Sequence, residues 1–203
     1  MSEQAYHLWR KLTQNTSTNS SLYKALQFTQ YNLQTLVNQP FAVEDISCQT
    51  CTLDQLSRYV PSPEDETVAV YLQIGDTLLG HAILIIPMVD AYQLAEWLLQ
   101  EPLAPTGEID PLMSSALAET GNVLIASFLN ALSQLNKQTS ILPSPPAVIV
   151  DMFATVMQVV ATAVASAFDE VTIIASDFKH TNSNLSLRLW LLPDPTTFIM
   201  ARR

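Results

Sequence analysis

Residues 171–193 read V-T-I-I-A-S-D-F-K-H-T-N-S-N-L-S-L-R-L-W-L-L-P, which is the pattern of a β-hairpin. Two runs rich in β-branched and large apolar residues flank the polar segment T-N-S-N, as two antiparallel strands flank their turn. A hairpin of the same kind is predicted at 67–87, with a turn at Gly75 and Asp76. Both hairpins end in proline, and they lie about one hundred residues apart, a spacing longer than that of solenoid repeats. The pair therefore predicts an internal duplication.

Each hairpin is preceded by a predicted helix and an extended segment. The expected elements are helices at 20–38, 90–100, 110–137 and 152–167 and extended segments at 41–53 and 147–150. Asp110 followed by Pro111 is a strong helix start, and Asp151 is interpreted as the N-cap of the last helix. The sequence thus predicts one α/β (α+β) domain over 1–203, with pseudo-twofold helix-plus-hairpin halves at 1–100 and 101–203.

The composition permits a sizeable core and excludes some partners. The chain has 203 residues, of which 48% are hydrophobic and 14% charged, so a folded domain is expected. The formal net charge is −10. This balance disfavours nucleic acid or an anionic membrane as the main partner.

No membrane segment or signal peptide is expected. The N-terminus M-S-E-Q-A-Y-H-L-W-R lacks a basic region followed by an apolar run. The most apolar stretch, 147–168, contains Asp151 as its only charge, but it begins like a strand and has no Lys or Arg flank. We interpret it as a strand and a buried helix, and we expect a cytoplasmic protein.

Neither the cysteines nor the glycines indicate a cofactor site. Cys48 and Cys51 form C-Q-T-C within a strand-like segment rather than at a helix start, so we interpret them as ordinary thiols of a reduced protein. The three histidines are scattered. Four glycines in the chain form neither G-x-G-x-x-G nor a Walker motif, which disfavours dinucleotide and ATP chemistry.

The helix predicted at 110–137 carries a polar stripe. Within S-A-L-A-E-T-G-N, residues 115–122, the side chains of Ser115, Glu119 and Asn122 fall within roughly 60° of one another at helical spacing. Taken alone, such a stripe is most often a solvated face. Gly121 weakens the helix, and it permits close approach either of a partner's backbone or of this protein's own sheet.

The stripe also has a chemical use. An exposed carboxylate can pair with a lysine of a partner, and an amide offers a donor and an acceptor that can hold and direct a water molecule. Phosphoryl transfer asks a protein mainly for positioning and charge stabilisation. One carboxylate and one amide can therefore suffice where the partner supplies the phosphate and the metal.

At this point the sequence resembles a known family. Ser115, Glu119, Asn122 and Pro145 form S-x(3)-E-x(2)-N-x(22)-P, which resembles the active-site motif of the CheC / CheX / FliY family of chemotaxis phosphatases. The segment P-P-A-V-I-V-D-M and the duplicated plan are similar to CheC, and the plan covers nearly the whole chain.

The resemblance implies hydrolysis of the aspartyl phosphate of a CheY-like response regulator. Glu119 would pair with a lysine of the regulator and Asn122 would orient the attacking water. Ser115, Gly121 and Pro145 would shape the site. The Mg²⁺ ion is expected on the response regulator, so the chain needs no cofactor of its own.

The first half departs from the family pattern. Its helix offers Ser20, Lys24 and Gln27 in one register or Ser21, Ala25 and Phe28 in the next, and neither contains the Glu–Asn pair. This face either docks a partner or simply packs. An alternative function is a CheC-like adaptor with little turnover that binds a response regulator or a CheD-like deamidase, and a flagellar switch domain ranks lower. The oligomeric state is left open.

Overall fold

The computed structural model describes residues 3–14, 20–52, 55, 62–75, 79–137, 141–164 and 170–194. The helices and strands follow in the order α1 (Glu3–Thr13), α2 (Ser20–Val37), β1 (Phe41–Thr52), β2 (Glu66–Ile74), β3 (Gly80–Pro87), α3 (Met88–Leu99), α4 (Pro111–Leu135), β4 (Ala147–Met152), α5 (Phe153–Val164), β5 (Glu170–His180) and β6 (Ser186–Pro193). Both predicted hairpins are present, as β2–β3 and β5–β6. The turn residue Asp76 lies outside the described residues.

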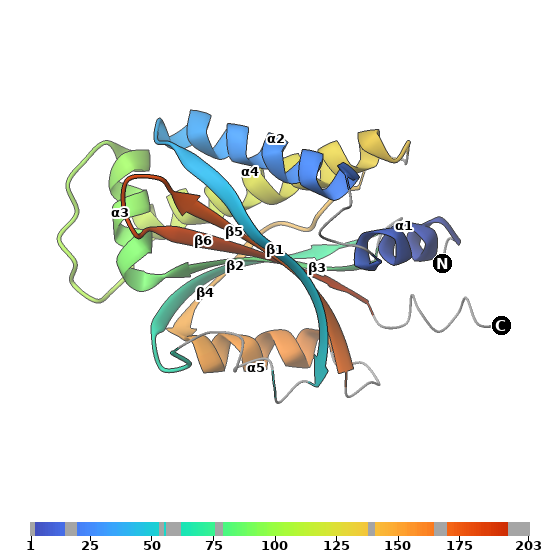
Figure 1. The fold of residues 1–203 in the computed structure, drawn as a ribbon. Helices are drawn as coiled ribbons and strands as arrows, with labels where there is room; N and C mark the ends of the chain where they lie inside the picture. The colour runs from blue at the N-terminus through green and yellow to red at the C-terminus, as the bar shows by residue number, and fades with distance from the viewer. Residues whose placement is uncertain are drawn as a thin grey trace.

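The six strands form one antiparallel sheet in the order β1-β5-β6-β3-β2-β4 (Figure 1). Exchanging β1 with β4, β2 with β5 and β3 with β6 gives the same order read backwards. The two hairpins therefore meet at the centre through β3 and β6, and each half adds one edge strand. The predicted α/β class with pseudo-twofold halves is confirmed, whereas the boundary near residue 101 stays a prediction.

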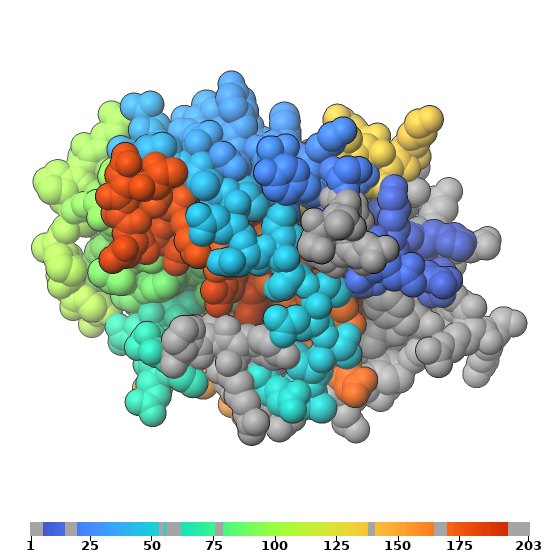
Figure 2. Space-filling view, in the orientation of Figure 1, coloured from blue at the N-terminus to red at the C-terminus, as the bar shows by residue number. Residues whose placement is uncertain are grey.

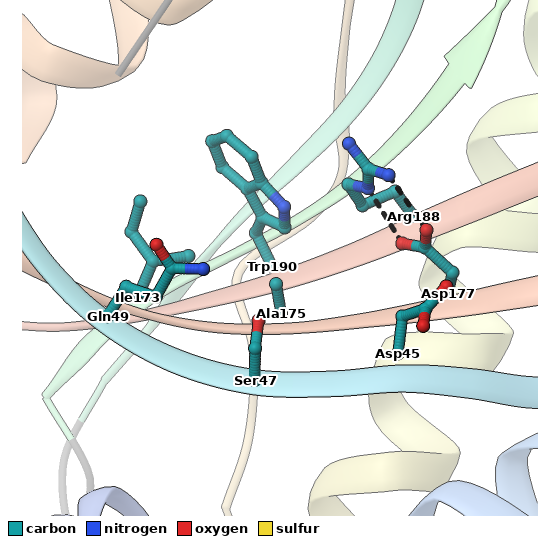
Figure 3. Close-up of a pocket in the computed structure, with 8 residues that line it drawn as sticks. All are labelled: Asp45, Ser47, Gln49, Ile173, Ala175, Asp177, Arg188 and Trp190. Atoms are coloured by element: carbon teal, nitrogen blue, oxygen red, sulfur yellow. Dashed lines mark hydrogen bonds and ion pairs between the residues drawn. The ribbon is translucent and has the colours of Figure 1, made fainter. Parts of the chain in front are cut away.

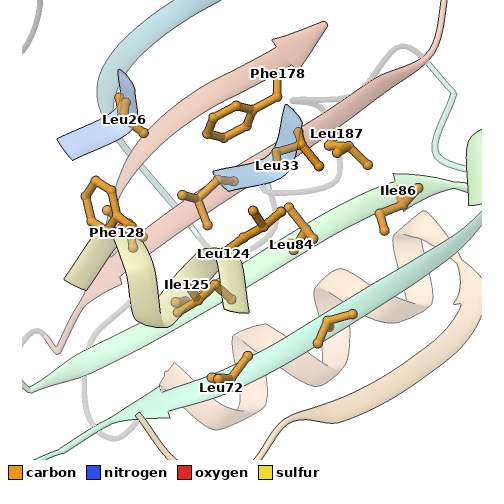
Figure 4. Close-up of a cluster of buried hydrophobic side chains, with 14 of the residues drawn as sticks. Leu26, Leu33, Leu72, Leu84, Ile86, Leu124, Ile125, Phe128, Phe178 and Leu187 are labelled. Carbon is orange, nitrogen blue, oxygen red and sulfur yellow. The ribbon is translucent and has the colours of Figure 1, made fainter. Parts of the chain in front are cut away.

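One face of the sheet is covered by α2 and α4, which lie side by side across it (Figure 1). Both helices present one apolar side to the sheet, because their buried residues recur every three or four positions. Figure 4 shows Leu26, Leu33, Leu124, Ile125 and Phe128 from the helices facing apolar side chains of the strands. This layer is the main core of the protein. Leu135, the last residue of α4, is 41% exposed.

The other face of the sheet is covered by α5 (Figure 1). The predicted division of 147–168 into a strand and a helix is confirmed, but Asp151 does not cap the helix. The first amides of α5, those of Phe153 and Ala154, donate instead to the carbonyls of Asp65 and Pro63. Within the described part of the chain, Asp151 accepts a hydrogen bond only from the amide of Met152, its neighbour in β4. A loop distant in sequence thus supplies the cap, and the helix is buried on one side only, with Val159 47% exposed.

Two further helices differ from expectation. The sequence analysis did not predict α1, whose Leu8, Trp9 and Leu12 are buried and whose Trp9 Nε1 donates to the Leu79 carbonyl at 2.9 Å. Their spacing of three and four residues was the signal that could have revealed it. Helix α3 begins at Met88, two residues before the predicted start, because Pro87 takes the N-cap position directly after β3.

Strand β1 contains a β-bulge, which reverses the side of the sheet that each later residue of the strand faces. Glu44 pairs with Asp177 and Ser47 pairs with Ala175, so β1 holds one more residue than β5 in this interval. Asp45 takes a left-handed conformation there, with φ of 52°. Because of the extra residue, Glu44 and Ser47 face the same side of the sheet despite their odd spacing.

By length and mean hydropathy, α4 alone among the helices of the described residues is capable of crossing a membrane. It is also the central helix of the main core, with ten buried residues. A buried core helix of a globular domain passes the same test. The two cysteines lie in β1, as predicted, where Cys48 is half-buried and Cys51 is buried.

Candidate functional site

The candidate site lies on α4, whose start is set by its own sequence. Asp110 is the N-cap, and its Oδ1 accepts hydrogen bonds from the amides of Leu112 and Met113, each at 2.8 Å. Pro111 occupies the first turn, where its missing amide proton costs nothing. The predicted helix start is therefore confirmed, and it sets which side of α4 each later residue occupies.

Helix α4 has three distinct sides. Gly121 faces the sheet and lies against Val70 of β2. About 120° around the helix, Ser127 accepts a hydrogen bond of 2.8 Å from Asn32 of α2. At about 120° in the other sense stand Ser115, Glu119 and Asn122, which therefore point away from α2. Strand β4 is the edge strand beside β2, so this third side of α4 faces the β4 edge of the sheet.

The polar stripe is accessible to a partner. Ser115 and Glu119 are exposed, and Asn122 is half-buried. No described residue forms a hydrogen bond or an ion pair with the Glu119 carboxylate or the Asn122 amide. The structure thus brings the three predicted residues together on one side of α4, and the two groups with chemical use have no competing interaction within the described protein.

Gly121 allows α4 to approach its own sheet. A Cβ built on Gly121 would lie 2.5 Å from Cγ1 and 2.7 Å from Cβ of Val70, closer than real side chains approach. Of the two explanations for this glycine, close contact with the protein's own sheet is therefore present. The neighbouring Asn122 is half-buried.

Pro145 lies at the same edge of the sheet, in the segment that leads into β4. It is exposed, and the preceding Ser144 ties this segment to the end of β2. The Ser144 amide donates to the Gln73 carbonyl at 2.8 Å, and the Gln73 amide donates to Ser144 Oγ at 2.9 Å. The sequence analysis missed Ser144, because nothing in the sequence indicates which distant backbone its hydroxyl meets.

Strand β4 then pairs with β2, with Val148 opposite Val70. Gly121 lies over that same valine, so the middle of α4 and the start of β4 meet at one strand residue. The middle of α4 and the start of β4, more than twenty positions apart in the sequence, are therefore joined through Val70.

The equivalent side of α2 carries no such pair. Ser20, Lys24 and Gln27 are all exposed, so this register does not pack against the protein. In the other register Ala25 is buried and Phe28 is 50% exposed. The first half therefore presents an accessible helix face on which Lys24 stands in the place of the glutamate and Gln27 in the place of the asparagine.

Comparison with known proteins agrees with the resemblance. Residues 112–150, which contain Ser115, Glu119, Asn122 and Pro145, match the CheC-like family. The CheY-P phosphatase CheC of Bacillus subtilis (strain 168) is 27% identical over 169 residues, which cover 80% of this chain and 79% of that protein.

Solved structures show the same fold. The crystal structure of FliY from Thermotoga maritima superimposes with a TM-score of 0.65 at 14% identity, covering 100% of this chain and 95% of that one. CheX from Borrelia burgdorferi, crystallised with CheY, BeF3 and Mg²⁺, gives a TM-score of 0.51 at 16% identity, covering 86% and 98%. The resemblance of this chain to the CheC / CheX / FliY family is therefore confirmed in both sequence and fold.

Proposed function

We propose that this protein docks on a phosphorylated CheY-type response regulator and accelerates hydrolysis of its aspartyl phosphate. The similarity to a CheY-P phosphatase supports the reaction class. The fold similarity to CheX, which was crystallised with CheY, supports a response regulator as the partner. Because response regulators act in the cytoplasm, the proposal places this protein there.

In the proposed reaction, Glu119 and Asn122 have separate roles. The Glu119 carboxylate pairs with a lysine of the regulator and sets the docking pose. The Asn122 amide enters the regulator's active site and directs a water molecule at the phosphorus. The water oxygen bonds to phosphorus while the acyl-phosphate P–O bond breaks, which releases inorganic phosphate and restores the aspartate of the regulator.

The remaining site residues shape this surface. Gly121 sets the height of Asn122 above the sheet, Ser115 extends the exposed side of the helix, and Pro145 borders it from the segment before β4. The Mg²⁺ ion needed to neutralise the phosphoryl charge belongs to the regulator in this proposal.

One observation carries the proposal. Glu119, which is exposed, and Asn122, which is half-buried, lie on one side of α4, and neither the carboxylate nor the amide has a hydrogen-bond or ion-pair partner among the described residues. They lie inside the segment that matches the CheC-like family. A merely solvated stripe would require neither this combination of groups nor the helix–sheet contact at Gly121.

The test follows the decay of a phosphorylated response regulator with wild-type protein and with Asn122→Ala. Asn130→Ala is the matched control, since Asn130 is exposed on the same helix about two turns beyond Asn122. Wild type and Asn130→Ala should accelerate the decay, and Asn122→Ala should lose about a hundredfold or more of that acceleration while it still binds. A folded Asn122→Ala variant with full activity would remove Asn122 from the site.

The adaptor alternative predicts a different result in the same assay. An adaptor would bind the phosphorylated regulator, or a CheD-like deamidase, without accelerating the decay even at stoichiometric excess. The accessible face of α2, which lacks the Glu–Asn pair, is compatible with such docking.

A further inference from the structure

A second site candidate lies on the opposite face of the sheet, away from the polar stripe. A cavity of about 230 Å³ opens between β1, β5 and β6 beside the region covered by α5. In the space-filling view, red atoms of the C-terminal hairpin show through beside the cyan strand β1 (Figure 2). The pseudo-twofold relation makes β1, β5 and β6 the counterparts of β4, β2 and β3. The cavity therefore occupies the position that corresponds to α5 in the other half of the sheet.

The floor of the cavity is apolar. Ala175 pairs with Ser47 on one side and with Trp190 on the other, so the three side chains form one row across the strands (Figure 3). Ile173 lies in the next row, opposite Gln49. Such a floor suits a flat ring that covers the short Ala175 side chain.

Trp190 lines this cavity and has an unsatisfied, buried donor. Trp190 is 2% exposed, and its Nε1 is buried without a hydrogen-bond acceptor in the described part of the chain. In contrast, Trp9 donates its Nε1 to a backbone carbonyl. Figure 3 shows the indole nitrogen of Trp190 on the edge of the ring that is turned towards Arg188. A buried N–H without an acceptor is unfavourable, so a ligand oxygen that reaches it would relieve this cost.

The charges around the cavity restrict the ligand. Arg188 binds Asp177 through two hydrogen bonds of 2.7 Å, and Lys179 binds Asp45 at 2.8 Å. The ion pair with Asp177 and the charge of Asp45 both raise the pKa of Arg188, so this guanidinium stays charged and paired. Each of these carboxylates is already paired with a cation, so neither an anion nor a cation finds an unpaired counter-charge there, and a cation brings no acceptor for Trp190. The ligand that fits is uncharged.

The rim of the cavity adds side chains that can both donate and accept hydrogen bonds. The Ser47 hydroxyl and the Gln49 amide line the side formed by β1 (Figure 3). An amide offers the complementary pair, a carbonyl oxygen beside an N–H. We propose that this cavity binds a small, uncharged, ring-shaped molecule that carries an amide, with its carbonyl oxygen on Trp190 Nε1 and its ring over Ile173 and Ala175.

Arg188 and Trp190 define the path of entry. They stand two residues apart on β6 and face the same side of the sheet, so their side chains are neighbours on the cavity wall. The Arg188 side chain is 30% exposed and its guanidinium is held by Asp177, so the proposal requires this ion pair to shift for the carbonyl oxygen to reach Trp190 Nε1.

The test uses the indole N–H signals of the ¹⁵N-labelled full-length protein in two-dimensional NMR. The chain has three tryptophans, so single Trp→Phe variants assign the signals. Benzamide is the probe, and benzoate is its charged counterpart of nearly the same shape. Benzamide should move the Trp190 signal in a saturable way and leave the Trp9 signal in place, while benzoate should bind at least about tenfold more weakly.

Two variants complete the test. Trp190→Phe keeps the ring contact but removes the donor, and it should weaken benzamide binding about three- to tenfold, measured on the backbone amides of β5. Thr50→Ala, on the side of β1 away from the cavity, should leave the affinity unchanged. The proposal is overturned if benzamide, nicotinamide and uracil all leave the Trp190 signal unmoved, if benzoate binds as tightly as benzamide, or if Trp190→Phe binds benzamide as wild type does.

Discussion

Gly121 of α4 and Val70 of β2 are in such close contact that no side chain fits between them. A Cβ added to Gly121 would meet all three side-chain carbons of Val70 at 2.5–3.1 Å. Val70 is itself fully buried between β3 and β4, so it cannot move away. The glycine therefore sets the distance between the helix that carries the stripe and the sheet beneath it.

Replacing Gly121 by alanine should destabilise the protein although alanine is the better helix former. The clash should cost about 1–3 kcal/mol, more than the gain of up to about 1 kcal/mol in helix propensity. Urea unfolding measures this difference. The acceleration of phosphate hydrolysis should also fall, because Asn122 moves outward with the helix.

Val70→Ala provides the control for that prediction. If the contact is the cause, Gly121→Ala and Val70→Ala should couple favourably by about 1 kcal/mol or more in the double variant. Additive effects of the two substitutions would show that Gly121 acts in some other way.

Glu119 should act through its charge at the docking step. Glu119→Gln keeps the shape but removes the charge, and it should weaken binding to the phosphorylated regulator about two- to fivefold at low salt. The difference should shrink as the ionic strength rises, because salt screens exposed ion pairs. Titrations at low and high salt measure it, and a loss of affinity that does not depend on salt would exclude the ion pair.

The pair of Asp177 and Arg188 should contribute to stability. Asp177 is 6% exposed and accepts two hydrogen bonds from the guanidinium, so Asp177→Asn leaves a half-buried arginine without its counter-charge. We expect a loss of about 1–3 kcal/mol in chemical unfolding, reduced from the cost of a fully buried pair by the exposed part of Arg188. The matched variant Asp45→Asn, on the exposed side of the same cavity, should change stability little. Equal losses of stability in Asp177→Asn and Asp45→Asn would contradict the prediction that the buried pair contributes more than the exposed one.

Stability should fall on mild acidification because of His81. Burial lowers the pKa of His81 below 6.5, and its Nδ1 is 2.6 Å from the Tyr71 hydroxyl. The unfolded chain therefore binds a proton at a higher pH than the folded protein does. The neutral state of His81 favours folding above about pH 6.5, and this contribution declines as the pH falls below that value.

The free energy of unfolding between pH 8 and pH 5.5 measures the effect. His81→Gln removes the titrating group, so its stability should depend less on pH than that of wild type over this interval. An unchanged slope would assign the acid sensitivity to other groups.

The N-cap of α4 should stabilise the protein about as much as helix caps in other proteins do. Asp110→Ala removes the acceptor for two backbone amides and should cost about 1 kcal/mol, or roughly 2–4 °C in Tm for a domain of this size. Asp110→Asn retains a capping oxygen and should lose less. Thermal unfolding of the two variants separates the cap from a general effect of the substitution.

Local features explain why much of the fold could be predicted. The hairpins alternate around short polar turns, and the Asp110-Pro111 pair marks a helix start by chemistry that involves only neighbouring residues. The stripe of Ser115, Glu119 and Asn122 could also be located, because helical spacing alone places the three residues on one side. The failures concern long-range contacts: the cap of α5 comes from the carbonyls of Asp65 and Pro63, and Ser144 is held by β2.

The cavity on the opposite sheet face illustrates the limit most clearly. Its walls come from three strands, and the bulge at Asp45 decides that Ser47 and Gln49 face it. A single extra residue in a strand changes the sheet face to which every later side chain points. The residues around Asp45 form no local pattern that predicts this bulge.

By itself, the sequence determined the duplicated helix-plus-hairpin plan, the start of α4 and the composition of its polar stripe, because each depends on residues within a few positions of one another. Only the tertiary structure decided which side of α4 remains uncovered, how closely Gly121 approaches Val70, and that Trp190 is buried without an acceptor. These properties depend on the register and packing of segments distant in sequence, where the position of each side chain follows from the fold as a whole.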